Sequence, residues 1–156
     1  EKNVNVYILV WNETKVASAL NSLHTKKQLE KLHPNIKVLC HPASAPLYWS
    51  HHQKVVVVDQ DIAFVGGLDL CFGRYDDTNH DMVDACHLRT RWPGKDYFNE
   101  GLKAFVGLDQ PFSDAVDRTQ VPRLPWHDIH VCVDGTAARD VACSFIQRWN
   151  HHVLDL

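Results

Sequence analysis

The 156-residue sequence is poor in the features that define membrane, secreted and nucleic-acid-binding proteins. No apolar run approaches the roughly 20 residues that a membrane-spanning helix needs. No secretory signal peptide is visible, and the chain begins with Glu1 rather than with methionine. The formal net charge is −3 with histidines neutral, whereas a nucleic-acid binder usually carries a basic surface. The length suits one domain, residues 1–156, which we expect to be a fragment of a longer protein.

Cysteines are also sparse in the arrangement that metal binding requires. None of them forms a C-x-x-C pair, so a structural zinc site of the usual kind is not expected. An odd number of widely spaced thiols is typical of a reduced, cytosolic protein in which most of them are buried. The five positions are Cys40, Cys71, Cys86, Cys132 and Cys143.

The first part of the sequence predicts a βαβ unit. Residues 4–11 (VNVYILVW) and 36–40 (IKVLC) are apolar and rich in β-forming residues, which favours two buried strands. Thr25 and Gln28 fit a capping box, so we expect a short helix to begin there and to end before Pro34. Two strands joined by helix are usually parallel, with a right-handed crossover. Apolar residues before that helix also recur at helical spacing: Val16, Leu20 and Leu23.

The middle of the sequence predicts a hairpin followed by a long irregular segment. Residues 54–59 and 62–69 read as two strands joined by a turn at residues 59–61. Residues 73–125 show scattered charges, several prolines and little apolar periodicity. A long irregular stretch in a compact domain tends to be functional or to act as a lid.

The last part of the sequence predicts a strand and a helix. Residues 127–135 alternate in polarity, and Gly135 with Thr136 opens a segment of helical spacing. One face of that helix is apolar: Ala138, Val141, Ala142, Phe145, Trp149 and Val153. Together these elements predict an α/β domain, with a mixed, mostly parallel sheet covered by helices on both faces.

Residues 51–69, HHQKVVVVDQDIAFVGGLD, place a histidine and a lysine two residues apart at the start of a predicted strand. Side chains in a strand alternate between its faces, so His52 and Lys54 should project together. A neutral imidazole can attack phosphorus, and a neighbouring ammonium can hold a phosphate oxygen. Asp59 has the opposite parity and lies at the predicted hairpin corner, where a structural role suits it better.

The spacing H-x-K-x-x-x-x-D, followed by G-G-x-D, resembles the HKD motif of the phospholipase D superfamily. The segments LHPNIKVLCHP, WPGKDYFN and VPRLPWHDIHVCVDG extend the resemblance over nearly the whole chain. They are similar to the first catalytic half of eukaryotic phosphatidylcholine-hydrolysing phospholipases D. The resemblance implies two such motifs in one parent chain, on halves related by pseudo-two-fold symmetry with the active site between them. No second H-x-K-x-x-x-x-D occurs here, so the chain carries half a site.

The resemblance also implies roles for the motif residues. His52 corresponds to the histidine that acts as nucleophile, through a phosphohistidine, or as the acid that protonates the leaving group; we favour the nucleophile. Lys54 corresponds to the phosphate-binding lysine, and Asp59 to the motif aspartate. Gly66 and Gly67, with Asp69 after them, match the G-G-x-D variant of eukaryotic lipases. Glycines at these positions let an anion approach the backbone N–H groups.

The activity implied by the resemblance is hydrolysis of phosphatidylcholine to phosphatidate and choline, or transfer of the phosphatidyl group to an alcohol. It implies a cytoplasmic, peripheral membrane protein whose partners are the phospholipid surface and the second half of the parent chain, with no nucleic acid. The core chemistry requires no cofactor or metal, although calcium is a possible regulator. His127 and Asp128 are assigned a supporting role, because the segment PWHDIH recurs near the catalytic centre of the family.

Two further groups of residues carry open alternatives. The acidic loop GRYDD, with Asp81 and Asp84, could bind calcium, but the absence of EF-hand spacing favours solvated loop charge. Aromatic residues of the irregular segment could enter a membrane interface, yet packing within the loops is the more usual role. These are Trp92, Tyr97, Phe98, Phe105 and Phe112.

Two other functions compete with the lipase. One is another phosphodiesterase of the superfamily, such as a nuclease, against which the acidic balance argues. The other is an inactive half or scaffold whose parent has no intact second motif. The parent sequence beyond Leu156 would distinguish them.

Overall fold

The computed structural model describes residues 3–12, 22–41, 51–84, 91–99, 101, 107 and 109–154. It divides the chain into two compact units, one formed by Glu1–Val65 with Cys132–Leu156 and the other by Gly66–Val131. We call these unit 1 and unit 2. The expectation of a single domain over residues 1–156 stays a prediction.

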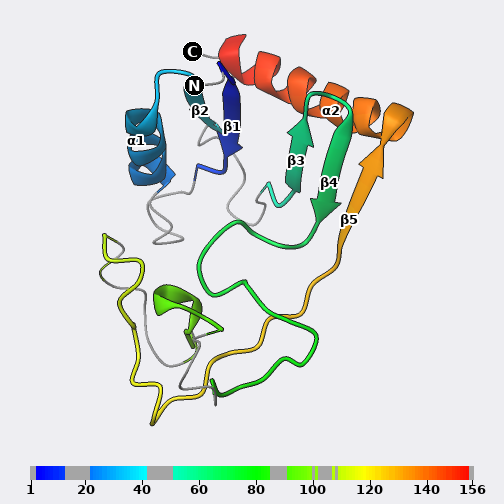
Figure 1. Ribbon diagram of the computed structural model, residues 1–156. Coiled ribbons are helices and arrows are strands. Elements are labelled where there is room, and N and C mark those ends of the chain that lie inside the picture. The colour runs from blue at the N-terminus through cyan, green and yellow to red at the C-terminus, as the bar shows by residue number, and fades with distance from the viewer. Residues whose placement is uncertain are drawn as a thin grey trace. The chain divides into compact units, whose positions relative to one another are not determined.

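Unit 1 begins with the predicted βαβ arrangement (Figure 1). Strands β1 (Val6–Val10) and β2 (Ile36–Cys40) are parallel, with Val6 opposite Ile36 and Val10 opposite Cys40. Helix α1 (Ser22–Leu32) connects them and packs against β2. The predicted parallel pair is therefore confirmed.

The predicted start of this helix is wrong. Helix α1 begins at Ser22, so Thr25 lies inside its first turn instead of capping it. No glycine or proline lies between Ser22 and Thr25 to interrupt a helix, so the capping pattern at Thr25 does not mark the first residue of α1. The helix ends at Leu32, ahead of Pro34, as predicted. The helical spacing expected from Val16 to Leu23 falls mainly on residues 13–21, which lie outside the described part of the chain.

The remaining strands form a second, antiparallel sheet in the order β3–β4–β5 (Figure 1). They are β3 (Lys54–Val58), β4 (Ile62–Gly66) and β5 (His130–Asp134). The prediction of one mostly parallel sheet is therefore wrong for the described residues. The physical reason is the short connection between β3 and β4, because a tight turn can join only antiparallel neighbours.

Helix α2 (Gly135–Leu154) follows β5 without a loop and contacts both β2 and β3. Gly135 has a φ of +57°, a left-handed conformation that glycine adopts without strain, and its N–H donates to the Asp61 carbonyl at 3.2 Å. Ala138 and Ala142 of the predicted apolar face are buried, whereas Val153 is exposed. The predicted helix is confirmed.

Unit 2 is almost entirely irregular, as the sequence predicts. Among its described residues the only helix is the short 3₁₀ turn η1 (Gly94–Asp96). The loops pack around a small core made of Trp92, Tyr97, Phe98 and Val116. Loop packing is thus confirmed for three of the five aromatic residues named above, while Phe112 is exposed and Phe105 lies outside the described residues.

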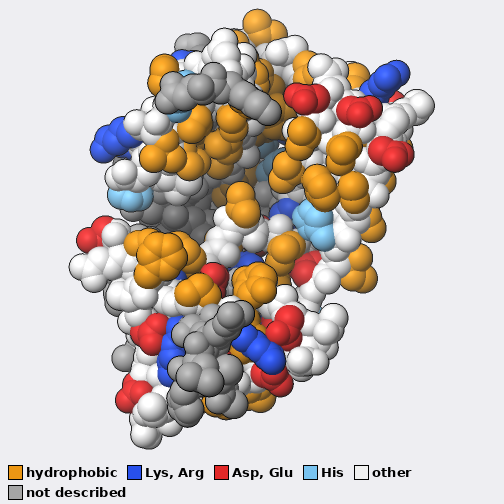
Figure 2. Space-filling model, viewed as in Figure 1, with side chains coloured by type: hydrophobic (Ala, Val, Ile, Leu, Met, Phe, Trp, Pro, Cys, Tyr) orange, Lys and Arg blue, Asp and Glu red, His pale blue; other side chains and the backbone are white. Residues whose placement is uncertain are grey.

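Apolar side chains also remain on the surface of unit 1 (Figure 2). On the three-stranded sheet they include Val56, Val58, Ile62 and Phe64, each 38–50% exposed. In the described part of the chain, no helix has both the length and the hydropathy needed to cross a bilayer.

Candidate active site

His52 and Lys54 lie together at the beginning of β3. Lys54 is the first residue of the strand, and its Nζ donates a hydrogen bond to the backbone oxygen of His52 at 3.1 Å. His52 itself is exposed and precedes the regular strand by two positions. The lysine ammonium is therefore adjacent to the backbone of His52. Strand alternation alone does not explain this, because His52 lies outside the strand.

Asp59 forms the hairpin corner predicted from the sequence. Asp59 and Gln60 have φ values of 52° and 60°, and the Asp61 N–H donates to the Val58 carbonyl at 3.0 Å. Positive φ at both central residues is the requirement of a two-residue type I′ hairpin turn. Aspartate tolerates this conformation better than most residues, because its short polar side chain can bond locally. Asp59 thus forms part of the backbone turn that joins β3 and β4.

In unit 2, Gly66 and Gly67 lie against the segment that contains Asp128. A Cβ atom added to Gly67 would overlap the Asp128 carboxylate, and one added to Gly66 would overlap the Ile129 carbonyl. The Gly67 N–H also donates to Ile129 O at 3.0 Å. The structure therefore brings together two predicted site segments, and it shows why neither glycine can carry a side chain. The Gly67 N–H, one of the two backbone N–H groups expected to receive an anion, is therefore already bonded to the Ile129 carbonyl.

Asp69 follows in the same loop, and its backbone oxygen accepts a hydrogen bond from the Cys71 N–H at 3.0 Å. Its carboxylate is partly buried. The predicted residues thus fall into two groups, one in each unit. His52, Lys54 and Asp59 belong to unit 1, and the glycine pair, Asp69, His127 and Asp128 belong to unit 2.

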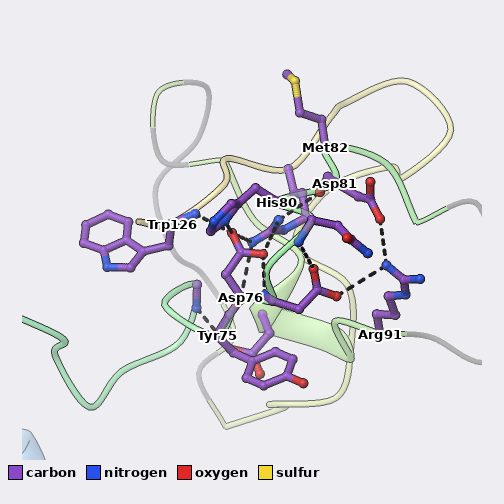
Figure 3. A network of polar contacts seen from close by, with 12 residues as sticks. Tyr75, Asp76, His80, Asp81, Met82, Arg91 and Trp126 are labelled. Atoms are coloured by element: carbon purple, nitrogen blue, oxygen red, sulfur yellow. Dashed lines mark hydrogen bonds and ion pairs between the residues drawn. The ribbon is translucent and has the colours of Figure 1, made fainter. Parts of the chain in front are cut away.

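His127 is exposed, and it stacks on a partly buried polar network that the sequence did not predict. Its ring stacks on His80, with centroids 3.5 Å apart and planes inclined by 21°. His80 Nδ1 lies 3.2 Å from Asp76 Oδ2, and Asp76 pairs with Arg123 at 2.9 Å (Figure 3). The backbone N–H of Trp126 donates to the same carboxylate at 2.7 Å. This network links the loop after Gly73 to the segment just before His127.

The charge of Asp76 is strongly stabilised. Burial alone would raise the pKa of its carboxyl group. Hydrogen bonds from Arg123, the Trp126 N–H and His80 outweigh that effect and hold the pKa well below its usual range. Arg123 is 1% exposed, so this ion pair is buried. No local pattern signals it, because the two residues lie 47 positions apart in the sequence.

A cavity of about 390 Å³ opens beside this network within unit 2. Its lining combines aromatic, basic and acidic groups, and the Arg74 guanidinium covers the Trp126 ring at 3.7 Å. The side chains that line it include Asp76, His80, Trp126, Asp128 and His130. Asp128 therefore borders both the glycine pair and this cavity.

The acidic loop residues are paired with arginines. Asp77 and Asp81 contact Arg91, and Asp84 contacts Arg118 at 3.3 Å. The interpretation of these carboxylates as solvated loop charge is wrong for Asp76 and Asp84, whose side chains are only 5% exposed. Within the described ranges no group of three or more histidine, cysteine or acidic side chains has an arrangement that could hold a metal ion. Regulation by calcium stays a prediction.

Comparison with known proteins extends over nearly the whole chain. The family model described as Phospholipase D matches residues 1–155. Phospholipase D A of Dictyostelium discoideum is 52% identical over 151 residues, 97% of this chain and 12% of that protein. Phospholipase D zeta 2 of Arabidopsis thaliana is 46% identical over 154 residues, 97% of this chain and 14% of that protein. Phospholipase D2 of Bos taurus is 45% identical over 174 residues, 96% of this chain and 18% of that protein. The chain spans less than a fifth of each of these relatives.

Proposed function

Because this chain belongs to the phospholipase D family, we propose that the protein containing it cleaves phosphatidylcholine to phosphatidate and choline. The observation that carries the proposal is the adjacency of His52 and Lys54, joined by the hydrogen bond from Lys54 Nζ to the His52 carbonyl. In the proposed site the His52 imidazole supplies a nucleophile and the Lys54 ammonium a fixed positive charge for one phosphate group. The remaining half of the site comes from a second HKD motif in the same parent chain.

The proposed reaction proceeds in two displacements. The neutral imidazole of His52 attacks phosphorus, the P–N bond forms, and the bond from phosphorus to the choline oxygen breaks. The departing oxygen takes a proton from the histidine of the second motif, acting as general acid. Lys54 holds a non-bridging phosphate oxygen, whose negative charge grows in the transition state.

The second displacement releases the product. Water attacks the phosphohistidine, gives its proton to the second histidine, and the P–N bond breaks to leave phosphatidate. A primary alcohol that attacks instead of water yields a phosphatidyl-alcohol. In this scheme Asp59 acts through the hairpin turn. The protein works at a phospholipid surface from the cytoplasm, and the core steps need no cofactor.

The test uses the full-length parent protein with phosphatidylcholine vesicles. We expect choline release, and phosphatidylethanol as a second product in dilute ethanol. Rapid quench followed by mass spectrometry should locate an acid-sensitive phosphate adduct on His52. Substituting His52→Ala should abolish turnover, whereas His24→Ala, an exposed histidine on α1, should leave it unchanged.

Three results would contradict parts of the proposal. A parent without lipase turnover and without a second motif would be a non-catalytic scaffold. Turnover without phosphatidylethanol would exclude the covalent route. An adduct on the second-motif histidine would retain the covalent route and make His52 the general acid. The 156-residue chain by itself should show no turnover, because it carries one motif.

A further inference from the structure

Arg148 contacts the residues on both sides of His52. It lies on helix α2, and its Nη1 contacts Nε2 of His51 and donates a hydrogen bond to Oε1 of Gln53. His51 and Gln53 are the immediate neighbours of His52 in the chain. A single guanidinium nitrogen therefore holds the short segment from which the candidate nucleophile projects.

This segment is not part of the regular strand. β3 begins at Lys54, so residues 51–53 precede its ladder of hydrogen bonds. Inside a sheet, ladder bonds fix the position of each residue, but side-chain contacts must do so where the ladder has not begun. Of the residues in this segment, His51 is partly buried, and His52 and Gln53 are exposed. The Arg148 contacts are thus well placed to decide where the imidazole of His52 stands.

The contact requires a neutral His51. Arginine only donates hydrogen bonds, so Nε2 of His51 must accept. Burial, and after it the charge of Arg148, lowers the pKa of His51 below its ordinary value. The ring centroids of His41 and His51 lie 4.5 Å apart. Burial is the main cause that lowers the pKa of His41 to about 4. Both imidazoles are therefore neutral at neutral pH.

The groups around His51 are cations and other histidines. Protonation of His51 would place a second positive charge against Arg148 and convert an acceptor into a donor, which would break the contact. The groups that face it come from α2, from the residue after β2 and from the motif segment itself: Arg148, His152, His41, His52 and Lys54.

We propose that Arg148 is a positioning residue for His52. By holding His51 and Gln53, it fixes the backbone from which His52 reaches the phosphate. This inference rests on the proposed function, in which His52 attacks phosphorus. Arg148 touches no reacting atom itself, so its loss should slow the chemical step and leave lipid binding unchanged.

The test compares Arg148→Ala, Arg148→Lys and Arg139→Ala in the full-length parent protein. Arg139 is an exposed arginine on the same helix and serves as the matched control. We expect Arg148→Ala to lower kcat by roughly ten- to a hundredfold, because a displacement of about 1 Å costs this much, with KM within about twofold. Arg148→Lys should recover part of the rate. Millimolar guanidinium should restore part of kcat to Arg148→Ala.

A purely structural role of Arg148 predicts different outcomes for these kcat measurements. If kcat of Arg148→Ala stays within twofold of wild type, or falls without any rescue by guanidinium or lysine, the positioning role is wrong. The variant His52→Ala distinguishes a failure of the positioning role from a failure of the proposed function. An inactive His52→Ala with a normal Arg148→Ala overturns the positioning role alone, whereas a fully active His52→Ala overturns the assignment of His52 as well.

A second variant covers the case in which Arg148→Ala does not fold. Gln53→Ala removes one of the two acceptors and leaves α2 intact. Its effect on kcat should be several-fold, and it should be smaller in an Arg148→Lys background, because lysine retains only part of the contact that Gln53→Ala removes. Additive effects of the two substitutions would contradict the proposal.

Discussion

Unit 1 presents His52 and Lys54 at the start of a strand, whereas unit 2 presents Gly67 and Asp128 on irregular backbone. In unit 1 the backbone groups of the strands satisfy one another along ladders. In unit 2 arginine side chains take over part of this task. Arg118 donates to the Trp92 carbonyl at 2.7 Å, and Arg123 donates to the Asp81 carbonyl at 2.8 Å.

The difference shows two ways to hold a functional side chain. A ladder is local and repetitive, so the loss of one side chain leaves most of it intact. A buried guanidinium that bonds several loops at once differs, because its loss removes several hydrogen bonds together. Arg123, for example, bonds the Tyr75 and Asp81 carbonyls and the Asp76 carboxylate. We therefore expect the folding stability of unit 2 to be more sensitive to single arginine substitutions than that of unit 1.

The largest effect should come from Arg123→Met. It leaves the buried Asp76 carboxylate without its arginine partner, which costs on the order of 3–5 kcal/mol of local stability. Hydrogen exchange of peptides covering residues 91–99 in the parent protein should report this as faster exchange. Arg91→Met removes exposed pairs instead and should cost less than about 1 kcal/mol. Similar exchange in the two variants would contradict the comparison.

The next effect concerns the chemistry of unit 1. Lys54→Arg keeps the charge but replaces a compact ammonium by a planar fork, and the resulting misplacement of phosphate should lower turnover on the order of a hundredfold. Choline release by the parent protein measures the change. Lys27→Arg, on the exposed side of α1, is the control. Activity within a few fold of wild type would show that Lys54 does not touch the phosphate.

A smaller effect is expected at the hairpin corner. Asp59→Val places a β-branched residue at a φ of 52°, which costs roughly 1–2 kcal/mol. Asp59→Asn keeps a side chain that tolerates this conformation, so it should retain the thermal stability and most of the turnover of wild type. A variant Asp59→Asn that is stable but inactive would show that the carboxylate, and not the turn, is what catalysis needs.

The smallest effect is a pH dependence within unit 1. The folded state holds the pKa of His41 at about 4, whereas the unfolded chain has an ordinary value near 6.5. The unfolded state therefore binds the extra proton, and stability falls as the pH drops from about 6.5 to 4. Thermal unfolding of the parent and of His41→Gln should converge over this window. Parallel curves would mean that His41 titrates normally.

Elements with a local period could be predicted from the sequence, whereas contacts between distant residues could not. The strand at residues 36–40 and helix α2 follow from apolar spacing, and the hairpin follows from its turn residues. The HKD spacing predicts His52, Lys54 and Asp59 as site residues from nearby residues alone, and their roles stay a prediction. The Asp76–Arg123 pair and the contact of Arg148 with His51 join residues 47 and 97 positions apart. No periodicity reports such separations.

The predicted sheet arrangement was wrong for a related reason. Apolar strands in a row suggest parallel pairing, but pairing direction depends on how the strands are connected. The turn at Asp59 and Gln60 was visible in the sequence and required antiparallel neighbours for β3 and β4. The carboxylate partners of the loop arginines offered no such local signal, so Asp76 and Asp84 read as solvent-exposed.

The turn at Asp59 also gives a meaning to the spacing of the motif. The four residues between Lys54 and Asp59 are the rest of strand β3, so the motif counts the length of one strand. Their identity can vary among apolar residues, but their number cannot. One inserted residue would rotate Lys54 to the opposite face relative to the turn, because side chains alternate. The length of one strand thus fixes the separation between the hairpin turn and Lys54, the proposed phosphate-binding group.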